Sequence, residues 1–286
     1  YIMNETEITA LFIRLTSSIG LLPYIAYIIV FLFHKDEYTL SFLVKFQLCM
    51  SCLVYSGSYL FPKTEVDSFF CKIQALLNTF SDLSVLAIAT SIVFVAQIGF
   101  SRPIELESKK RLYFILSLIF CWIVPISVSI FSILYGGTTN SSDFCWIAQW
   151  KAIFIFIGIR SVFYIIYYII AINLLITVNN LVARVSKEHA LIDYKALIQK
   201  NIFIVSILCV VFVIYVILDV LMFYEISLPG EFYIWLVTGI LDCLSRPCFV
   251  LLFSFDKGSR DELIRILTCK KEEEKLVEQS EMVVDN

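Results

Sequence analysis

A run of apolar residues from Cys71 to Phe100 constrains this chain more than any other feature of its sequence. The run is about thirty residues long, enough for a bilayer span, and its acidic residue is Asp82. At a rise of about 1.5 Å per residue, a helix of this length crosses a bilayer. Because hydrocarbon offers no water to pair with backbone groups, a single apolar run must form a helix there. The sequence therefore predicts a membrane-spanning helix.

Similar apolar runs occur along the rest of the chain. Of its 286 residues, 59% are hydrophobic and 16% are charged, which is unlike an ordinary soluble domain. We therefore predict an all-α membrane protein, a seven-transmembrane helix bundle over residues 9–256. The predicted spans are residues 9–33, 38–61, 71–100, 112–135, 150–179, 197–224 and 232–255. Ser101-Arg102-Pro103 is expected to end the third span.

Three shorter segments complete the predicted organisation. Residues 1–8 form a polar N-terminal lead. Residues 257–269 mix apolar and charged positions in a pattern that predicts a short amphipathic helix on the inner leaflet. Residues 270–286 are acidic with few aromatic residues, and we expect them to be disordered.

The basic residues fall mainly on one side of the predicted membrane. That side carries Lys35, Arg102, Lys109, Lys110, Arg111, Arg184, Lys187, Lys195, Lys257, Arg260, Arg265, Lys270 and Lys271. The other side carries Lys63, Lys72 and Lys151, with Arg14 near its rim. The excess of positive charge marks the cytoplasmic side. We therefore predict a multi-pass plasma-membrane protein with its N-terminus outside and its C-terminus inside. Glycosylation acceptors at Asn4 and Asn140 fall on the predicted outer side.

Two of the nine cysteines lie at predicted extracellular ends of spans. Cys71 begins the third span, and Cys145 lies in the loop between spans four and five. In an oxidising compartment these two are expected to form a disulfide that ties the loop over the third helix. Cys269, just beyond the membrane inside, is a candidate palmitoylation site.

Several ionisable side chains fall inside the predicted spans, where burying them in hydrocarbon is unfavourable. With one amide, they form a candidate ligand pocket in the outer half of the bundle: Asn78, Asp82, Arg160, Asp219, Asp242 and Arg246. Asp242 and Arg246 are four residues apart and share a helix face. The same groups could instead form a charge network that holds the helices in register. The sequence leaves both alternatives open, and it leaves the charge of the ligand open.

Three short motifs add a family resemblance. They are Cys71-Lys72-Ile73-Gln74-Ala75 at the start of the third span, Phe144-Cys145-Trp146-Ile147 in the following outer loop, and Phe253-Ser254-Phe255-Asp256 at the end of the seventh span. In these motifs the chain resembles the cyclic-AMP-receptor-like (class E-type) G protein-coupled receptors. The resemblance implies an extracellular small-molecule or peptide ligand and a heterotrimeric G protein as partners. The candidate cytoplasmic surface includes Arg102, Arg184, Lys195 and Lys200.

Other functional classes are less consistent with the sequence. Zinc hydrolysis needs three or four ligands, and the only histidines are His34 and His189, both in predicted cytoplasmic loops. We expect no enzymatic activity, no cofactor and no nucleic-acid partner. A polytopic transporter and a non-signalling seven-helix protein remain alternatives, and the basic inner surface is also what contact with anionic membrane lipids predicts.

Overall fold

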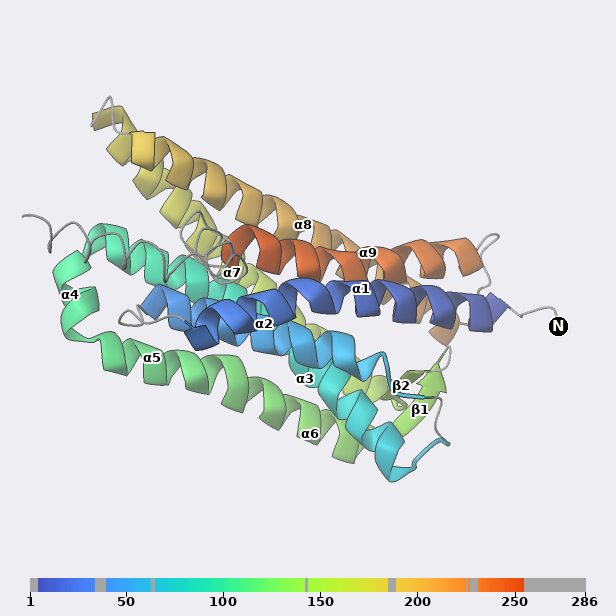
Figure 1. Ribbon diagram of the computed structural model, residues 1–286. Helices are drawn as coiled ribbons and strands as arrows, with labels where there is room; N and C mark the ends of the chain where they lie inside the picture. Colours follow the sequence, from blue (N-terminus) through green and yellow to red (C-terminus); the bar gives the residue numbers. More distant parts are fainter. Residues whose placement is uncertain are drawn as a thin grey trace, which may run out of the picture.

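The computed structural model describes residues 5–33, 40–62, 65–141, 144–184, 189–224, 226 and 231–254. This part of the chain is mainly helical, and its elements run as a bundle of long rods (Figure 1). The helices are α1 (Glu5–Phe33), α2 (Leu40–Ser58), α3 (Phe69–Ser101), α4 (Pro103–Ser108), α5 (Lys110–Leu118), α6 (Val124–Gly136), α7 (Trp150–Arg184), α8 (His189–Phe223) and α9 (Glu231–Ser254). A π-helix, Ile119–Ile123, joins α5 to α6, and two short strands precede α7.

The predicted class of all-α membrane protein fits this architecture. Within the described ranges, six helical segments are long and apolar enough to cross a membrane, counting Lys110–Gly136 as one continuous rod. They coincide with six of the predicted spans. Helix α2 occupies the place of the predicted second span, but it is 19 residues long and contains Lys45, and it is not one of the six.

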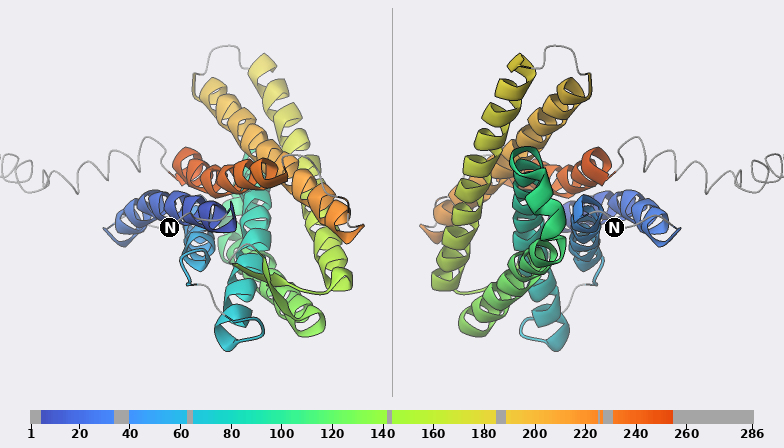
Figure 2. Two further views of the ribbon diagram at one scale, coloured as in Figure 1. Left: turned by 90° about the vertical axis from the view of Figure 1, so that its right-hand side faces the viewer. Right: turned by 90° about the vertical axis from the view of Figure 1, so that its left-hand side faces the viewer.

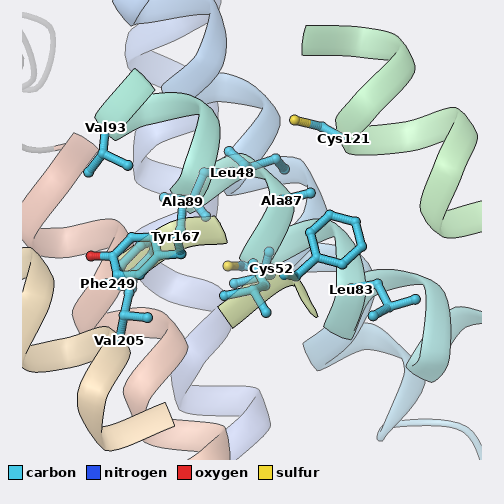
Figure 3. Close-up of a cluster of buried hydrophobic side chains, with 14 of the residues drawn as sticks. Leu48, Cys52, Leu83, Ala87, Ala89, Val93, Cys121, Tyr167, Val205 and Phe249 are labelled. Carbon is cyan, nitrogen blue, oxygen red and sulfur yellow. The ribbon is translucent and has the colours of Figure 1, made fainter. Parts of the chain in front are cut away.

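Helix α3 is the centre of the bundle. Every side chain from Asn78 to Ser91 is buried, because α2, α6, α7 and the strands pack around the helix. Figure 3 shows small α3 side chains such as Ala87 and Ala89 among larger ones, including Tyr167 of α7 and Phe249 of α9. Without a strong hydrophobic drive between helices in lipid, such small residues let neighbours approach closely and gain dispersion contacts.

The end of α3 is where the sequence predicts it. The helix stops at Ser101, and the N–H of Arg102 caps it by donating to the carbonyl of Ile98 at 2.7 Å. Residues 101–111, between the third and fourth predicted spans, are not all loop, because they contain α4. Proline at the first helical position needs no N–H partner, and Glu105 pairs with Arg102 at 3.2 Å and Lys109 at 2.9 Å, spacings that support a helix.

The sequence predicts a regular helix for the fourth span, but the structure contains a π-helix between α5 and α6. This π-helix lies immediately before Pro125, and proline has no N–H to donate to the carbonyl four residues earlier. That carbonyl belongs to Cys121, and it accepts a hydrogen bond from Ser84 Oγ of α3 at 2.7 Å. The irregular turn therefore has a partner for its freed backbone group, as membrane helices require.

The predicted polar loop before α7 contains an antiparallel hairpin. Strand β1 (Thr138–Ser141) pairs with β2 (Phe144–Ile147), so that Asn140 lies opposite Cys145. Gly137 has a φ of 64° at the entry to β1, a conformation that glycine adopts without strain. The hairpin lies at the end of the bundle where α1 begins (Figure 1). We call this the hairpin end, and the end that carries α4 the opposite end.

Helices α7 and α8 are each 35 residues long. Together they diverge from the other helices towards the opposite end, as the views in Figures 1 and 2 show. The helices continue beyond their apolar segments, Trp150–Asn180 and Ile198–Leu218: α7 continues to Arg184, and α8 already begins at His189. The added segments are polar but rich in helix-forming residues such as alanine, leucine and lysine, so the helices continue after the apolar pattern stops.

Candidate functional site

A cavity of about 180 Å³ lies within the bundle at the hairpin end. Helices α1, α2, α3, α7, α8 and α9 and strand β2 all contribute side chains to it. Its aromatic lining consists of Tyr55, Tyr59, Phe144, Trp146, Phe156, Phe212, Tyr215 and Trp235. Its polar lining includes Thr9, Asn78, Asp82, Arg160 and Asp242. A mainly aromatic wall with few converging polar groups is typical of a small-molecule site.

Four charged side chains lie together beside this cavity, and we call them the ion cluster: Asp82, Arg160, Asp242 and Arg246. The first three border the cavity. Asp82 Oδ1 accepts a hydrogen bond from Arg246 Nη2 at 2.8 Å, and its Oδ2 lies 2.6 Å from Arg160 Nη1. Arg246 Nη2 also donates to Asp242 Oδ1 at 3.2 Å. None of the four is more than 8% exposed. One carboxylate on α3 therefore joins guanidinium groups from α7 and α9.

Oδ2 of Asp82 is close to Arg160 but receives no directed hydrogen bond from any described residue. The contact is an ion pair in which the Nη1 hydrogen points away from the ideal direction. Distance governs the Coulomb attraction while angle governs the hydrogen bond. The charge of Arg160 therefore compensates that of Asp82, but Oδ2 has no hydrogen-bond donor directed at it.

Two tyrosines that the sequence analysis did not single out, Tyr55 on α2 and Tyr59 one residue after its end, lie at the site. Tyr55 OH donates a short hydrogen bond to Asp242 Oδ2, and its ring centroid lies 3.2 Å from the guanidinium carbon of Arg246. Tyr59 OH lies 2.9 Å from Tyr55 OH. Their spacing of four residues, which places both on one helix face, was the signal available in the sequence. Asp242 is thus held by Arg246 on its own helix and by α2.

The hairpin covers the cavity and is fixed to α3. The predicted disulfide between Cys71 and Cys145 is present, with 5.3 Å between the two Cα atoms. One helical turn into α3, Gln74 Oε1 accepts a hydrogen bond from the N–H of Cys145 at 3.1 Å. Gln74 Nε2 donates to the carbonyl of Ser58 at 2.9 Å. Because of the Cys-X-X-Gln spacing, α3 holds Cys145 both by a disulfide from Cys71 and by a hydrogen bond to Gln74.

Asn78 lies one turn beyond Gln74 on α3. Its Oδ1 accepts a short hydrogen bond from Ser58 Oγ. Its Nδ2 has no partner among the described residues, and the side chain borders the cavity. Asn78 therefore presents an unused N–H₂ donor one turn above Asp82.

Arg160 approaches the cavity from α7 among aromatic rings. Its guanidinium carbon lies 4.5 Å from the ring centroid of Phe212 and 5.9 Å from that of Tyr164. Its Nε is buried and has no hydrogen-bond partner in the described part of the chain. The cation is stabilised by Asp82 and by a π-face, yet part of its donor capacity is unused.

The structure brings together five of the six residues predicted to form the pocket. Asn78, Asp82, Arg160 and Asp242 border the cavity, while Arg246 lies behind them and is 1% exposed. The alternative of a charge network is therefore also observed, because the same carboxylates are ion-paired. Asp219 lies on α8, and its side chain is outside the described residues.

The predicted cytoplasmic residues lie at the opposite end. Arg102 and Lys200 are exposed and Lys195 is half-buried. Hydrogen bonds from Lys109 and Arg102 hold the pKa of Glu105 below its usual value.

Other predicted residues have no described side chain. Arg184 is the last residue of α7, and its side chain is not described, nor is that of Asn140 in β1. Asn4, Cys269, Lys187 and the predicted amphipathic helix 257–269 lie outside the described residues.

A second hollow opens on the side of the bundle between α3, α5 and α7. It measures about 240 Å³ and is lined by Thr90, Ser91, Phe94, Val95, Tyr113, Leu116, Ser117, Phe120, Ile166 and Ile170. No charged side chain borders it, and Phe94, Leu116 and Ile166 are also exposed on the bundle surface. It lacks the convergent polar groups of the first cavity.

No group of three or more potential metal ligands occurs in the described residues.

The comparisons with known proteins do not assign the chain. No model of a known protein family matches it, and no curated protein sequence matches it. The functional argument therefore depends on the geometry of the cavity, the ion cluster and the hairpin.

Proposed function

We propose that this chain is a seven-helix receptor that takes an extracellular ligand into the cavity and signals to a heterotrimeric G protein at its opposite end. The observation that carries the proposal is the position of the ion cluster. It borders the cavity and joins α3, α7 and α9 through Asp82, Arg160 and Arg246. A ligand that contacts this cluster alters interactions between helices directly, which is what a receptor requires.

The proposed topology counts α2 as a span and places the hairpin end outside. Support comes from described basic residues that gather at the opposite end: Arg102, Lys109, Lys110, Arg111, Lys195 and Lys200. An excess of lysine and arginine is typical of the cytoplasmic side. A disulfide at the hairpin end is consistent with an oxidising exterior. On this topology the protein resides in the plasma membrane with Asn140 on an extracellular hairpin.

The resemblance to cyclic-AMP-receptor-like proteins remains part of the proposal. Two of the motifs behind it have physical roles at the cavity. Gln74 hydrogen-bonds to the strand residue Cys145, and Trp146 borders the cavity and meets the ring of Phe156 edge-on at 5.8 Å. These contacts support a common way of covering the pocket.

Signalling on this proposal is a shift between two arrangements of the bundle. The ligand favours the arrangement that it binds more tightly, by no more than its difference in affinity for the two. The ion pair of Asp82 with Arg160 restrains α3 against α7. Its rearrangement would move the long inner ends of α7 and α8, where Lys195 and Lys200 lie, relative to α3.

The test is guanine-nucleotide exchange on a panel of purified heterotrimeric G proteins, with the full chain in lipid nanodiscs. Asp82→Asn removes the charge that holds both guanidinium groups, so basal exchange is expected to rise about fivefold or more, the low end of common allosteric couplings. Glu65→Gln is the matched control, because Glu65 is an exposed loop carboxylate at the hairpin end. Absence of exchange from every G protein, for wild type and variant alike, would refute the signalling step and favour the transporter, which solute uptake into liposomes would then test.

A further inference from the structure

The charges of the described ion cluster balance. Asp82 and Asp242 supply two negative charges, and Arg160 and Arg246 supply two positive charges. Each guanidinium is within 2.8 Å of a carboxylate oxygen. An ionic ligand would bring an uncompensated charge into a buried site, where desolvation disfavours it. The balance favours an uncharged ligand.

The aromatic wall does not reverse this preference. Aromatic faces attract cations, but two of those at this site are already occupied. Arg160 lies over Phe212 at 4.5 Å, and Arg246 lies over Tyr55 at 3.2 Å. A second cation beside either guanidinium would be repelled. An anion would in turn lie next to the carboxylates of Asp82 and Asp242, both of which border the cavity.

The unused hydrogen-bonding groups point to a particular functional group. Arg160 Nε and Asn78 Nδ2 are donors without partners among the described residues. Asp82 Oδ2, which lies 2.6 Å from Arg160 Nη1, is a buried acceptor without a directed hydrogen bond. Unsatisfied buried polar groups are rare and call for a partner. A carbonyl next to an N–H, as in a carboxamide, would accept from the donors and donate to the acceptor.

The size and walls of the cavity define the rest of the ligand. Eight aromatic residues border a space of about 180 Å³, which is below the roughly 300 Å³ at the lower end of drug-sized pockets. Rings in the wall favour a flat body that stacks or meets them edge-on. A small, planar compound fits this space better than a peptide.

We propose that the cavity binds a small, uncharged aromatic compound that presents a carboxamide-type carbonyl and N–H to Arg160, Asn78 and Asp82. The proposal rests on the receptor function proposed above and names the ligand class of the same site. Asn78 and Asp82 lie one turn apart on α3, so one amide group can contact both while its carbonyl faces Arg160.

The test uses three probes with one aromatic body: indole-3-acetamide, indole-3-acetate and tryptamine. Their dissociation constants are measured by ligand-observed saturation-transfer NMR with the full chain in nanodiscs. The amide is expected to bind about tenfold more tightly than either charged probe. Asn78→Leu is expected to weaken the amide about tenfold through loss of a buried hydrogen bond, whereas Asn179→Leu, the same change at an exposed position of α7, leaves binding unchanged.

A second variant protects the test against misfolding of Asn78→Leu. Val216 borders the cavity from α8, so Val216→Trp should fill it and abolish amide binding while the disulfide and the elution volume stay as in wild type. Tighter binding of tryptamine or indole-3-acetate would overturn the ligand class and leave the pocket in place. If Asp219→Asn removes a preference for tryptamine, the deciding charge is Asp219, and the uncharged class is again overturned.

Failure of all three probes to bind would also overturn the ligand class. Val216→Cys then separates the two proposals, through labelling with a charged thiol reagent added from the hairpin side. Reaction would show an open cavity whose ligand is of another class. No reaction, in a variant that elutes as wild type does, would count against the receptor pocket itself.

Discussion

The two halves of this bundle are held together in different ways. At the hairpin end, helices α3, α7 and α9 are joined by buried ion pairs and a strand is fixed to α3 by a disulfide. Towards the opposite end, the contacts around α3 include small and apolar side chains such as Ala89 and Val93 (Figure 3). The ion pairs described at that end, from Glu105 to Arg102 and Lys109, lie on the surface.

The difference shows how stability and specificity are divided. Buried ion pairs fix a geometry without adding much net stability, because desolvation offsets their attraction. Removing one partner is nevertheless severe, since the other charge is left alone. Apolar packing is spread over many weak contacts, and a single change is felt less. The hairpin half should therefore respond sharply to single substitutions and the opposite half gradually.

The largest expected effect is the loss of Arg246. Arg246→Leu leaves Asp242 without its guanidinium and Asp82 with one instead of two, so the free energy of unfolding should fall by about 3–5 kcal/mol. Denaturant unfolding in mixed micelles measures it. The matched control is Arg102→Leu at an exposed position, with an expected change within about 0.5 kcal/mol. Equal effects of the two variants would contradict the contrast between the halves.

The disulfide comes next. Cys71→Ser should lower the free energy of unfolding by about 2–4 kcal/mol, as loss of a native disulfide often does, and hydrogen exchange should increase in β2. Cys248→Ser, which changes an unpaired exposed cysteine, is the control and should behave as wild type. Increased exchange spread evenly over the bundle, instead of concentrated at the hairpin, would show that the bridge does not act locally.

A core truncation tests the apolar half. Ile88 is fully buried on α3, while Ile172 on α7 is 50% exposed. Ile88→Ala should destabilise by about 2 kcal/mol, the low end for such truncations, because an unfolded membrane chain still keeps its apolar side chains in lipid. Ile172→Ala should change the unfolding free energy little. If Ile88→Ala lowered the free energy of unfolding as much as Arg246→Leu does, the expected difference between the two halves would be contradicted.

The smallest expected effect is on a hydrogen bond between α3 and α7 towards the opposite end. Gln97 Nε2 of α3 donates to Thr177 Oγ1 of α7 at 3.3 Å. A double-mutant cycle with Gln97→Leu and Thr177→Val should give a coupling of about 0.6 kcal/mol, the average for hydrogen bonds between membrane helices. The same cycle with Asp82→Asn and Arg160→Gln should give a larger value. If the neutral pair couples as strongly as the ionic one, charge is not what distinguishes the two halves.

The sequence predicted those features that depend on spacing within one helix. Ser101-Arg102-Pro103 ends α3, and Asp242 and Arg246 share a face. The disulfide between Cys71 and Cys145 is the exception, because it joins two elements, and it was predicted from the expected extracellular position of both cysteines. The predictions within one helix need only the period of a helix and the conformational limits of proline.

The features that the sequence did not predict depend on contacts between helices. Tyr55 is a common residue in an apolar span, and only the packing of α2 against α9 places its hydroxyl beside Asp242. The role of Gln74 depends on the register of β2 above α3. The π-helix before Pro125 depends on Ser84, far away in the chain, to pair a freed carbonyl. In each case the partner that decides the outcome lies on another element.

Because α7 is long, a small movement at the cavity can displace its distant end. A helix of 35 residues is about 52 Å long, whereas the hydrocarbon layer is about 30 Å thick. Arg160 lies ten residues from the start of α7, so about two thirds of this rod extends beyond it like a lever arm. A tilt of about 5° pivoting near Arg160 would swing the far tip by roughly 3 Å, given 1.5 Å per residue. A sub-ångström adjustment beside one guanidinium is thereby magnified where the helix leaves the lipid.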